Sequence, residues 1–268
     1  MSRIQDKFLE LKAKNQKAFI AYAMAGYPNE REAMCIVRGL IQGGADILEL
    51  GLPFSDPLAD GPAIQNASFH ALQNRMNLDR FVNLVKKIRK ESNIPLVLMT
   101  YANLLYSHGY DKFIKVIKNA GIDGIILPDM SVEEAQPYLD AVHKNEMDAI
   151  FLISPNTSAE RTRMISNASS GFVYLVSVYG TTGGQQQFQK YTFDAIRAAS
   201  KTLDGRIPLA VGFGVSNAEQ ARFILQAGAD AIVVASAFLR LVDKTPQSKI
   251  QSKVASFAMR LKKATISE

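Results

Sequence analysis

Apolar segments of strand length alternate along the whole chain with segments of helical period. Residues that favour helix starts precede several helical segments: Ser131 stands three residues before Glu134, and Ser158 stands three residues before Arg161. The pattern predicts strand, helix, strand, helix throughout. The eight strand-length segments are residues 18–26, 45–53, 94–101, 121–129, 148–155, 171–177, 208–214 and 229–236.

Strands that are apolar on both faces and separated by helices indicate a parallel sheet, either doubly wound or closed into a barrel. Repetition favours the barrel, because a helix-end glycine and a strand-entry aspartate recur together and no early G-x-G-x-x-G opens a dinucleotide fold. We therefore predict the α/β class and a (β/α)8 TIM barrel. The recurring aspartates fall at strand starts, the end of such a barrel that serves stability: Asp46, Asp123 and Asp230.

Further helices are expected around this barrel. An extra N-terminal helix precedes the first strand, and its Phe8, Leu9 and Leu11 could plug the N-terminal face of the barrel. Two helices, over 63–75 and 78–92, follow the second strand, where a barrel repeat needs one. A last helix from about Gln247 to Ala264 should pack against the first helix of the barrel, which follows the first strand and contains Cys35. No linker or low-complexity tract interrupts the chain, so 1–268 is predicted to be a single domain.

Composition narrows the class of protein. With 268 residues and 47% hydrophobic content, the chain can bury a large core. The net charge of +6 is scattered over many helices, which favours anionic ligands weakly and does not support nucleic-acid binding. The N-terminal segment lacks the apolar centre of a signal peptide and the length of a membrane span, so no membrane association and a cytoplasmic location are expected. Cys35, the single cysteine, is expected to be a small core residue.

The second predicted strand carries an unusual carboxylate. Alternation places Ile47, Glu49 and Gly51 on one face and Leu48 and Leu50 on the other. If the leucines meet the helices, Glu49 points into the barrel, where desolvation would raise its pKa toward the range of a general acid or base. A structural carboxylate bonded to backbone is the alternative. Catalysis is favoured, because no obvious cationic partner lies in a neighbouring strand.

The loop after this strand combines carboxylates with proline. Pro53, Pro57 and Pro62 restrict its backbone, so it can hold a second carboxylate over the mouth of the barrel. Asp60 fits that role, but a turn or helix-capping role is equally compatible with its place before the next helix. Asp56 is expected farther out, at the surface.

A phosphate site is predicted at the last two strands. Such barrels bind phosphate with backbone N–H groups of the loops after strands seven and eight and of a short helix there. The seventh strand ends at Gly214 and the eighth at Ala235 and Ser236, where small or missing side chains permit close approach. The Gly-rich segment 177–190 is either a lid, with Gly180, Gly183 and Gly184 as hinges, or a disordered connection.

Missing residue types limit the reaction. No predicted strand contains a lysine, which disfavours a Schiff-base aldolase. His70, His108 and His143 are not at metal-ligand spacing, so no metal site is expected. Acid–base chemistry by carboxylates on a phosphate ester remains.

The run from Glu49 to Pro62, ELGLPFSDPLADGP, is similar to the signature of the tryptophan synthase α-subunit family. The resemblance implies reversible retro-aldol cleavage of indole-3-glycerol phosphate to indole and glyceraldehyde 3-phosphate, in the last steps of L-tryptophan biosynthesis, with no cofactor in this subunit. It continues through residues 99–103, 153–158, 172–177 and 212–216 and so covers nearly the whole chain.

The resemblance also implies a role for each site residue. Glu49 would protonate indole C3 and take the proton of the glycerol hydroxyl beside the scissile bond, and Asp60 would accept a hydrogen bond from the indole N–H. The indole and glycerol pocket would include Tyr22, Tyr101 and Tyr174. The phosphate would be bound by Gly183, Gly214, Ala235 and Ser236, with Thr182 in the closing loop of the substrate site.

The family further implies an α2β2 complex with a β subunit that carries pyridoxal phosphate and consumes the indole. The loop with Pro53, Asp56 and Pro57 and the segment that begins at Gly180 would face this partner. Three positions depart from the family pattern: Ala235 replaces a glycine, Ser131 stands where a proline is common after Asp129, and the lid contains Gln185–Gln187.

Three alternatives stay open. The chain could be an allosteric partner with weak chemistry, which intact Glu49 and Asp60 disfavour. It could be a free-standing lyase that releases indole, which a β subunit failing to co-purify would favour. It could also be another phosphate-binding barrel, such as a phosphosugar isomerase, which the length of the matching run disfavours.

Overall fold

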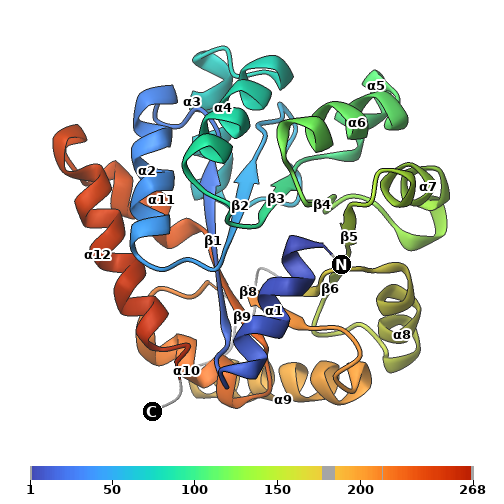
Figure 1. Ribbon diagram of the computed structural model, residues 1–268. Coiled ribbons are helices and arrows are strands. Elements are labelled where there is room, and N and C mark those ends of the chain that lie inside the picture. The colour runs from blue at the N-terminus through green and yellow to red at the C-terminus, as the bar shows by residue number, and fades with distance from the viewer. Residues whose placement is uncertain (1, 177–184, 213, 267–268) are drawn as a thin grey trace.

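One parallel sheet curves into a barrel with helices around it (Figure 1). The structure, a computed structural model, describes residues 2–176, 185–212 and 214–266. Its strands are β1 (Ala18–Met24), β2 (Ile47–Gly51), β3 (Leu96–Met99), β4 (Gly124–Ile126), β5 (Asp148–Ile150), β6 (Leu152–Ile153), β7 (Val173–Val176), β8 (Leu209–Gly212) and β9 (Ala231–Val234). They are ordered β5-β4-β3-β2-β1-β9-β8-β7-β6, which confirms the predicted (β/α)8 class.

The ring closes through a single chain segment. The fifth predicted strand is divided at Phe151: β5 pairs with β4, whereas β6 pairs with β7. The backbone N–H of Tyr174 donates to the carbonyl of Phe151 at 3.0 Å, so the divided segment joins the two ends of the sheet. Eight predicted strands therefore appear as nine, because this segment changes partner along its length.

The helices surround the sheet, and both predicted helices follow β2 (Figure 1). They are α1 (Arg3–Ala13), α2 (Glu30–Gln42), α3 (Pro62–Gln73), α4 (Leu78–Glu91), α5 (Ala102–His108), α6 (Tyr110–Ala120), α7 (Gln136–Lys144), α8 (Ala159–Ala168), α9 (Gln185–Leu203), α10 (Ala218–Gln226), α11 (Ser236–Asp243) and α12 (Ile250–Lys263).

Helix α1 covers the N-terminal end of the barrel (Figure 1). Ile4, Phe8 and Leu11 are buried against the inward-facing residues of the strands, in one apolar cluster. Leu9 was expected to share this role, but its side chain is 52% exposed. The helical turn explains the correction, since Ile4, Phe8 and Leu11 lie four and three residues apart on one face and Leu9 is rotated away from it.

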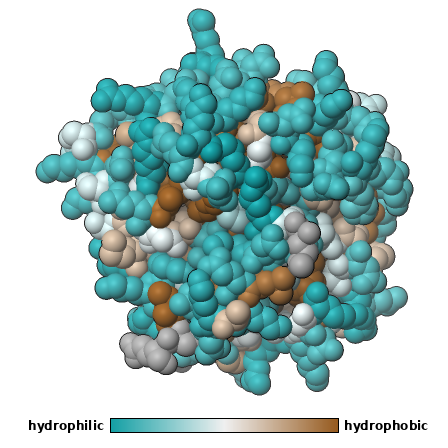
Figure 2. Space-filling model, in the orientation of Figure 1, coloured by the Kyte–Doolittle hydropathy of each residue, from teal (hydrophilic) through white to brown (hydrophobic). Residues whose placement is uncertain are grey.

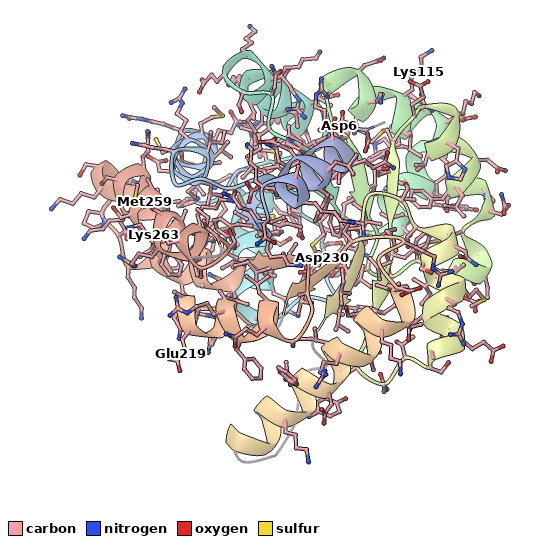
Figure 3. The ribbon with its side chains drawn as sticks, turned by 60° about the horizontal axis from the view of Figure 1, so that its bottom comes forward. Asp6, Lys115, Glu219, Asp230, Met259 and Lys263 are labelled. Atoms are coloured by element: carbon pink, nitrogen blue, oxygen red, sulfur yellow. The ribbon has the colours of Figure 1, made fainter. Side chains whose placement is uncertain are left out.

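The strand-start aspartates are structural, as predicted. Each accepts a hydrogen bond from the first residues of a neighbouring strand: Asp46 from Phe19 N at 2.7 Å, Asp123 from Leu96 N at 2.8 Å and Asp230 from Leu209 N at 3.1 Å. In Figure 3, Asp230 lies inside the outline of the barrel, whereas Lys115, Glu219 and Lys263 lie on outer helices. The repeated glycine–aspartate phrase thus ties adjacent strands together at their N-terminal ends.

Several helix boundaries differ from expectation. Ser158 caps α8, accepting from Arg161 N at 3.2 Å, as predicted. Ser131 precedes a 3₁₀ helix (Val132–Glu134) and not an α-helix, since α7 begins only at Gln136 beside a proline. Helix α9 begins at Gln185, so Gln185–Gln187 of the predicted lid segment are helical, and residues 177–184 of that segment lie outside the described residues.

The last helix packs against α2, the first helix after β1, as predicted, although α12 itself begins at Ile250 after a 3₁₀ turn (Gln247–Lys249). Cys35 is partly buried against the core beneath α2. Polar side chains dominate the face seen in Figure 2, with apolar atoms in small groups. Within the described residues, no helix has both the length and the apolar character that a membrane crossing needs.

Candidate functional site

A cavity of about 730 Å³ opens at the C-terminal ends of the strands. This is the end of a (β/α)8 barrel where reacting groups are found. Six of the predicted site residues line it together, although they come from five separate parts of the chain. They are Glu49, Asp60, Tyr174, Gly214, Ala235 and Ser236. Gly180, Thr182 and Gly183 lie outside the described residues.

Glu49 is a buried carboxyl group with no ion-pair partner among the described residues. Its side chain projects from the middle of β2 beside Tyr22 of β1 and Val97 of β3, and it is 2% exposed. Its Oε2 atom has no hydrogen-bond partner within the described part of the chain. Burial, followed by the negative charge of Asp60, raises the pKa of Glu49 to about 8. The alternative of a structural carboxylate bonded to backbone therefore finds no support.

Asp60 lies in the loop between β2 and α3. Its backbone completes a turn, with its N–H donating to Pro57 O at 3.1 Å and its carbonyl accepting from Gln65 Nε2 at 2.9 Å. Helix α3 starts after Gly61 with no side-chain cap, so the Asp60 carboxyl group does not cap it. Burial raises the pKa of Asp60 to about 6, and a hydrogen bond from Tyr101 opposes that rise.

Two of the predicted tyrosines support the carboxyl groups from outside the cavity lining. The Tyr101 hydroxyl accepts a hydrogen bond from Ala59 N at 3.1 Å, and its ring stacks on Phe54 at 5.2 Å, which holds the Asp60 loop over the mouth. Tyr22 is fully buried, and a side chain at Gly51 would collide with its hydroxyl. Burial raises the pKa of Tyr22, and the charges of Asp60 and Glu49 raise it further, so its hydroxyl stays protonated.

The predicted phosphate end of the cavity is built from backbone. Gly214 has a φ of +64°, which favours glycine, and its missing side chain leaves open space. Ser236 is the first residue of α11, whose N-terminal N–H groups are suited to an anion. Ala235 has a φ of −118°, outside the left-handed region that favours glycine, so the backbone does not require the glycine that is usual in the family at this position.

Sequence reasoning missed the apolar wall of the cavity. Met99 pairs with Gly51, two residues after Glu49, and Ile126 pairs with Met99. Met99 and Ile126 line the cavity, and Ile153 lines it from β6. The alternation that located Glu49 also predicts these positions. Arg161 and Arg240 line the cavity from helices, and no strand-based signal reveals them.

The predicted partner loop is only partly exposed. Asp56 is exposed, as expected, and accepts a hydrogen bond from Ser55 Oγ at 2.5 Å. Pro57 is half-buried and Pro53 is buried. The Ser68 hydroxyl of α3 accepts from Phe54 N at 3.2 Å and donates to Phe54 O at 3.0 Å, which fixes the loop to the barrel. Because Pro53 is buried, its side chain is not available on the surface of this loop.

Metal-ligating side chains do not gather in the described part of the chain. No three His, Cys, Asp or Glu residues are placed there to hold a metal ion. His70, His108 and His143 are exposed on three different helices.

Fold and site together define a (β/α)8 barrel with two carboxyl groups and an anion-suited helix start at its C-terminal mouth. Residues 8–266 match the family model described as tryptophan synthase alpha chain. The chain belongs to this family, and its role lies in tryptophan biosynthesis.

Individual relatives agree over nearly the whole length. The chain is 43% identical over 242 residues to the tryptophan synthase alpha chain of Methanosarcina barkeri, covering 90% of each chain. It is 41% identical to that of Solibacter usitatus, covering 98% of each. The crystal structure of tryptophan synthase subunit alpha from Legionella pneumophila superposes with a TM-score of 0.87 at 32% identity, covering 99% of this chain and 98% of that one.

Proposed function

We propose that this chain is a carbon–carbon lyase that cleaves indole-3-glycerol phosphate reversibly into indole and glyceraldehyde 3-phosphate. The observation that carries the proposal is Glu49: a buried carboxyl group with an unpartnered Oε2 and a pKa raised to about 8, in the same cavity as Asp60. A carboxyl group that is still protonated at neutral pH is suited to general-acid catalysis.

Cleavage begins with proton transfer from Glu49 to indole C3. This step breaks the aromaticity of the ring and places positive charge on its nitrogen. The Glu49 carboxylate then takes the proton of the glycerol hydroxyl beside the scissile bond. The O–H electron pair forms the aldehyde C=O, and the electrons of the broken C–C bond restore the aromatic indole. Glu49 ends protonated, so the cycle closes without a cofactor in this chain.

Asp60 stabilises the intermediate charge. With a pKa raised only to about 6, it is ionised when Glu49 is still protonated. As a carboxylate it accepts a hydrogen bond from the indole N–H, and this bond strengthens when the ring becomes positive. Met99, Ile126 and Ile153 supply the apolar surface that fits an indole ring.

The phosphate group is proposed to bind at Gly214, Ala235 and Ser236, with Gly183 completing the site and Thr182 in the closing loop. Backbone N–H groups at the start of α11 are suited to this anion, because they are not needed by the helix itself. The remaining end of the cavity then holds the indole ring beside Glu49 and Asp60.

A β subunit carrying pyridoxal phosphate is the proposed partner, in an α2β2 complex. Large apolar side chains are exposed around the β2–α3 loop: Leu58 is 92% exposed and Phe69 58%, and both line a shallow groove together with Asp56 and Pro57. Exposed apolar groups gathered around one loop are typical of a protein-binding surface. The cytoplasmic location and the single-domain organisation stay predictions.

Indole release tests the reaction. Purified chain, Glu49→Gln and Glu32→Gln are supplied with indole-3-glycerol phosphate, each with and without a tryptophan synthase β subunit. Glu32 is a matched control, because it too is buried with an unpartnered Oε2 but lies outside the cavity lining.

We expect slow release that the β subunit accelerates, loss of at least about a thousandfold in Glu49→Gln, and little change in Glu32→Gln. Equal losses in both variants would assign Glu49 a structural role. No release by the unaltered chain under any condition would overturn the proposed reaction, and release without stimulation would favour a free-standing lyase.

A further inference from the structure

Two arginines line the cavity, and their surroundings differ. Arg161 of α8 forms two hydrogen bonds with the Glu133 carboxylate, from NH1 to Oε1 at 2.6 Å and from NH2 to Oε2 at 3.2 Å. Its charge is therefore compensated. Arg240 of α11 makes no hydrogen bond or ion pair with any residue in the described ranges, and Asp243 on the same helix accepts its hydrogen bond from Tyr27. Arg240 is exposed, so solvent hydrates its charge, and no carboxylate in the described ranges neutralises it where it lines the cavity.

The position of Arg240 is fixed by the helix that begins at the phosphate end. Ser236 starts α11, and Arg240 follows four residues later, so the two side chains share one helical face. Both line the cavity, whereas Ala237, Phe238, Leu239 and Val242 are buried on the other side of the helix. Arg240 therefore lies one helical turn after the N-terminal N–H groups of α11 that are suited to the anion.

The charge of a bound phosphate group would need a positive group in this cavity. A phosphate monoester carries close to two negative charges at neutral pH, and the cavity already holds the Asp60 carboxyl group. Backbone N–H groups supply dipoles but no net charge. An arginine can neutralise one of the two charges and form charge-assisted hydrogen bonds with phosphate oxygens.

We propose that Arg240 binds the phosphate group of the substrate and sets the preference of this cavity for a dianionic ester. The proposal deepens the proposed function and rests on it for the identity of the substrate. Because Arg240 acts on the phosphate and not on the indole, it should affect substrate capture and leave the chemical step intact.

Three variants test the proposal: Arg240→Gln, the conservative Arg240→Lys, and Arg222→Gln. Arg222 is an exposed arginine on neighbouring α10 that does not line the cavity, so its variant controls for the loss of one positive charge. Steady-state kinetics with indole-3-glycerol phosphate is combined with calorimetric binding of glycerol 3-phosphate, which carries the phosphate without the ring.

In Arg240→Gln we expect KM and the Kd for glycerol 3-phosphate to rise about tenfold with kcat nearly unchanged, partial recovery in Arg240→Lys, and no change in Arg222→Gln. Equal behaviour of Arg240→Gln and Arg222→Gln would overturn the role of Arg240, as would a fall in kcat without a rise in Kd. If the unaltered chain binds glycerol 3-phosphate but releases no indole, the proposed reaction fails while the binding data still decide the role of Arg240.

Discussion

The proposed cleavage requires Glu49 and Asp60 to hold opposite protonation states. Glu49 has to be protonated, which its pKa of about 8 permits below that pH, and Asp60 has to be ionised, which its pKa of about 6 permits above that pH. We therefore expect kcat/KM for indole release to be bell-shaped, falling below about pH 6 and above about pH 8. A pH–rate profile with indole-3-glycerol phosphate measures this directly.

The variant Asp60→Asn tests whether Asp60 causes the fall of kcat/KM on the acidic side of the pH profile. It removes the group that must ionise, so the remaining activity should be far lower and should no longer fall between pH 7 and pH 5 because of this residue. An unchanged acidic limb in Asp60→Asn would mean that the substrate phosphate or another group causes it.

The same burial makes Glu49 a cost to folding at alkaline pH. Its pKa is raised from 4.5 to about 8, so the folded state binds the proton more tightly, and stability from this group is lost as pH rises through 8. Glu49→Gln does not titrate. We compare the free energy of unfolding of Glu49→Gln with that of the unaltered protein at each pH. The variant's value minus the unaltered protein's value should be larger at pH 9 than at pH 4.5, by up to about 4 kcal/mol. Urea unfolding at both pH values checks this, and a pH-independent difference would contradict it.

The sequence predicted the direction of a side chain correctly where that direction depends only on alternation along a strand. The inward direction of Glu49 follows from alternation with Leu48 and Leu50, and the outer core cluster does contain both leucines. The choice for Asp60 between a turn or capping role and a second carboxylate over the mouth could not be made from sequence, because the placement of its carboxyl group depends on a hydrogen bond from Tyr101 in another strand–helix unit.

At the scale of elements, the N-terminal ends of the strands depend on buried ion pairs. Asp123 is 5% exposed and accepts hydrogen bonds from Leu96 N and from Arg89, whose side chain is 13% exposed. Asp123→Ala leaves the Arg89 charge without its carboxylate and should lower the free energy of unfolding by about 3 kcal/mol. Kinetic constants for indole release should stay close to normal, because this end lies opposite the cavity.

The matched control is Glu91→Ala, which breaks the Arg38–Glu91 pair, whose side chains are 45% and 42% exposed. Solvent screens such a pair, so we expect little change in denaturant midpoint. Similar losses in both variants would show that burial does not distinguish the two pairs.

Element prediction was accurate for type and weaker at boundaries. Periodicity identified the helix before β1, but only the helical turn separates buried Phe8 from exposed Leu9. The division of the fifth strand at Phe151 arises from pairing with both β4 and β7, which is a property of the closed ring and not of local sequence. Local capping rules also placed a helix start at Ser131, where a 3₁₀ turn forms first.

At the scale of the whole molecule, closure of the ring brings the carboxyl end and the phosphate end of one cavity together. Glu49 and Ser236 are distant in sequence, yet β1 pairs with both β2 and β9, the strand before Ser236. The barrel prediction implied this proximity, because all parallel strands of a barrel end at one mouth. The arginines that line the mouth were not predictable, since their side chains enter from helices whose rotation depends on packing.

The exposed apolar groups beside the Asp60 loop lead to a prediction about assembly. Phe69 of α3 is 58% exposed and borders the groove with Leu58, whereas Met259 of α12 (labelled in Figure 3) is 48% exposed and does not line this groove. Large apolar residues at the centre of an interface contribute most of its affinity, so Phe69→Ser should weaken β-subunit binding by about tenfold or more. Met259→Ser removes similar exposed apolar surface and should not affect binding. Titration of each variant with β subunit, followed by indole release, separates the two surfaces: loss of stimulation confined to Phe69→Ser supports this face as the docking site, and loss confined to Met259→Ser would move the partner to α12.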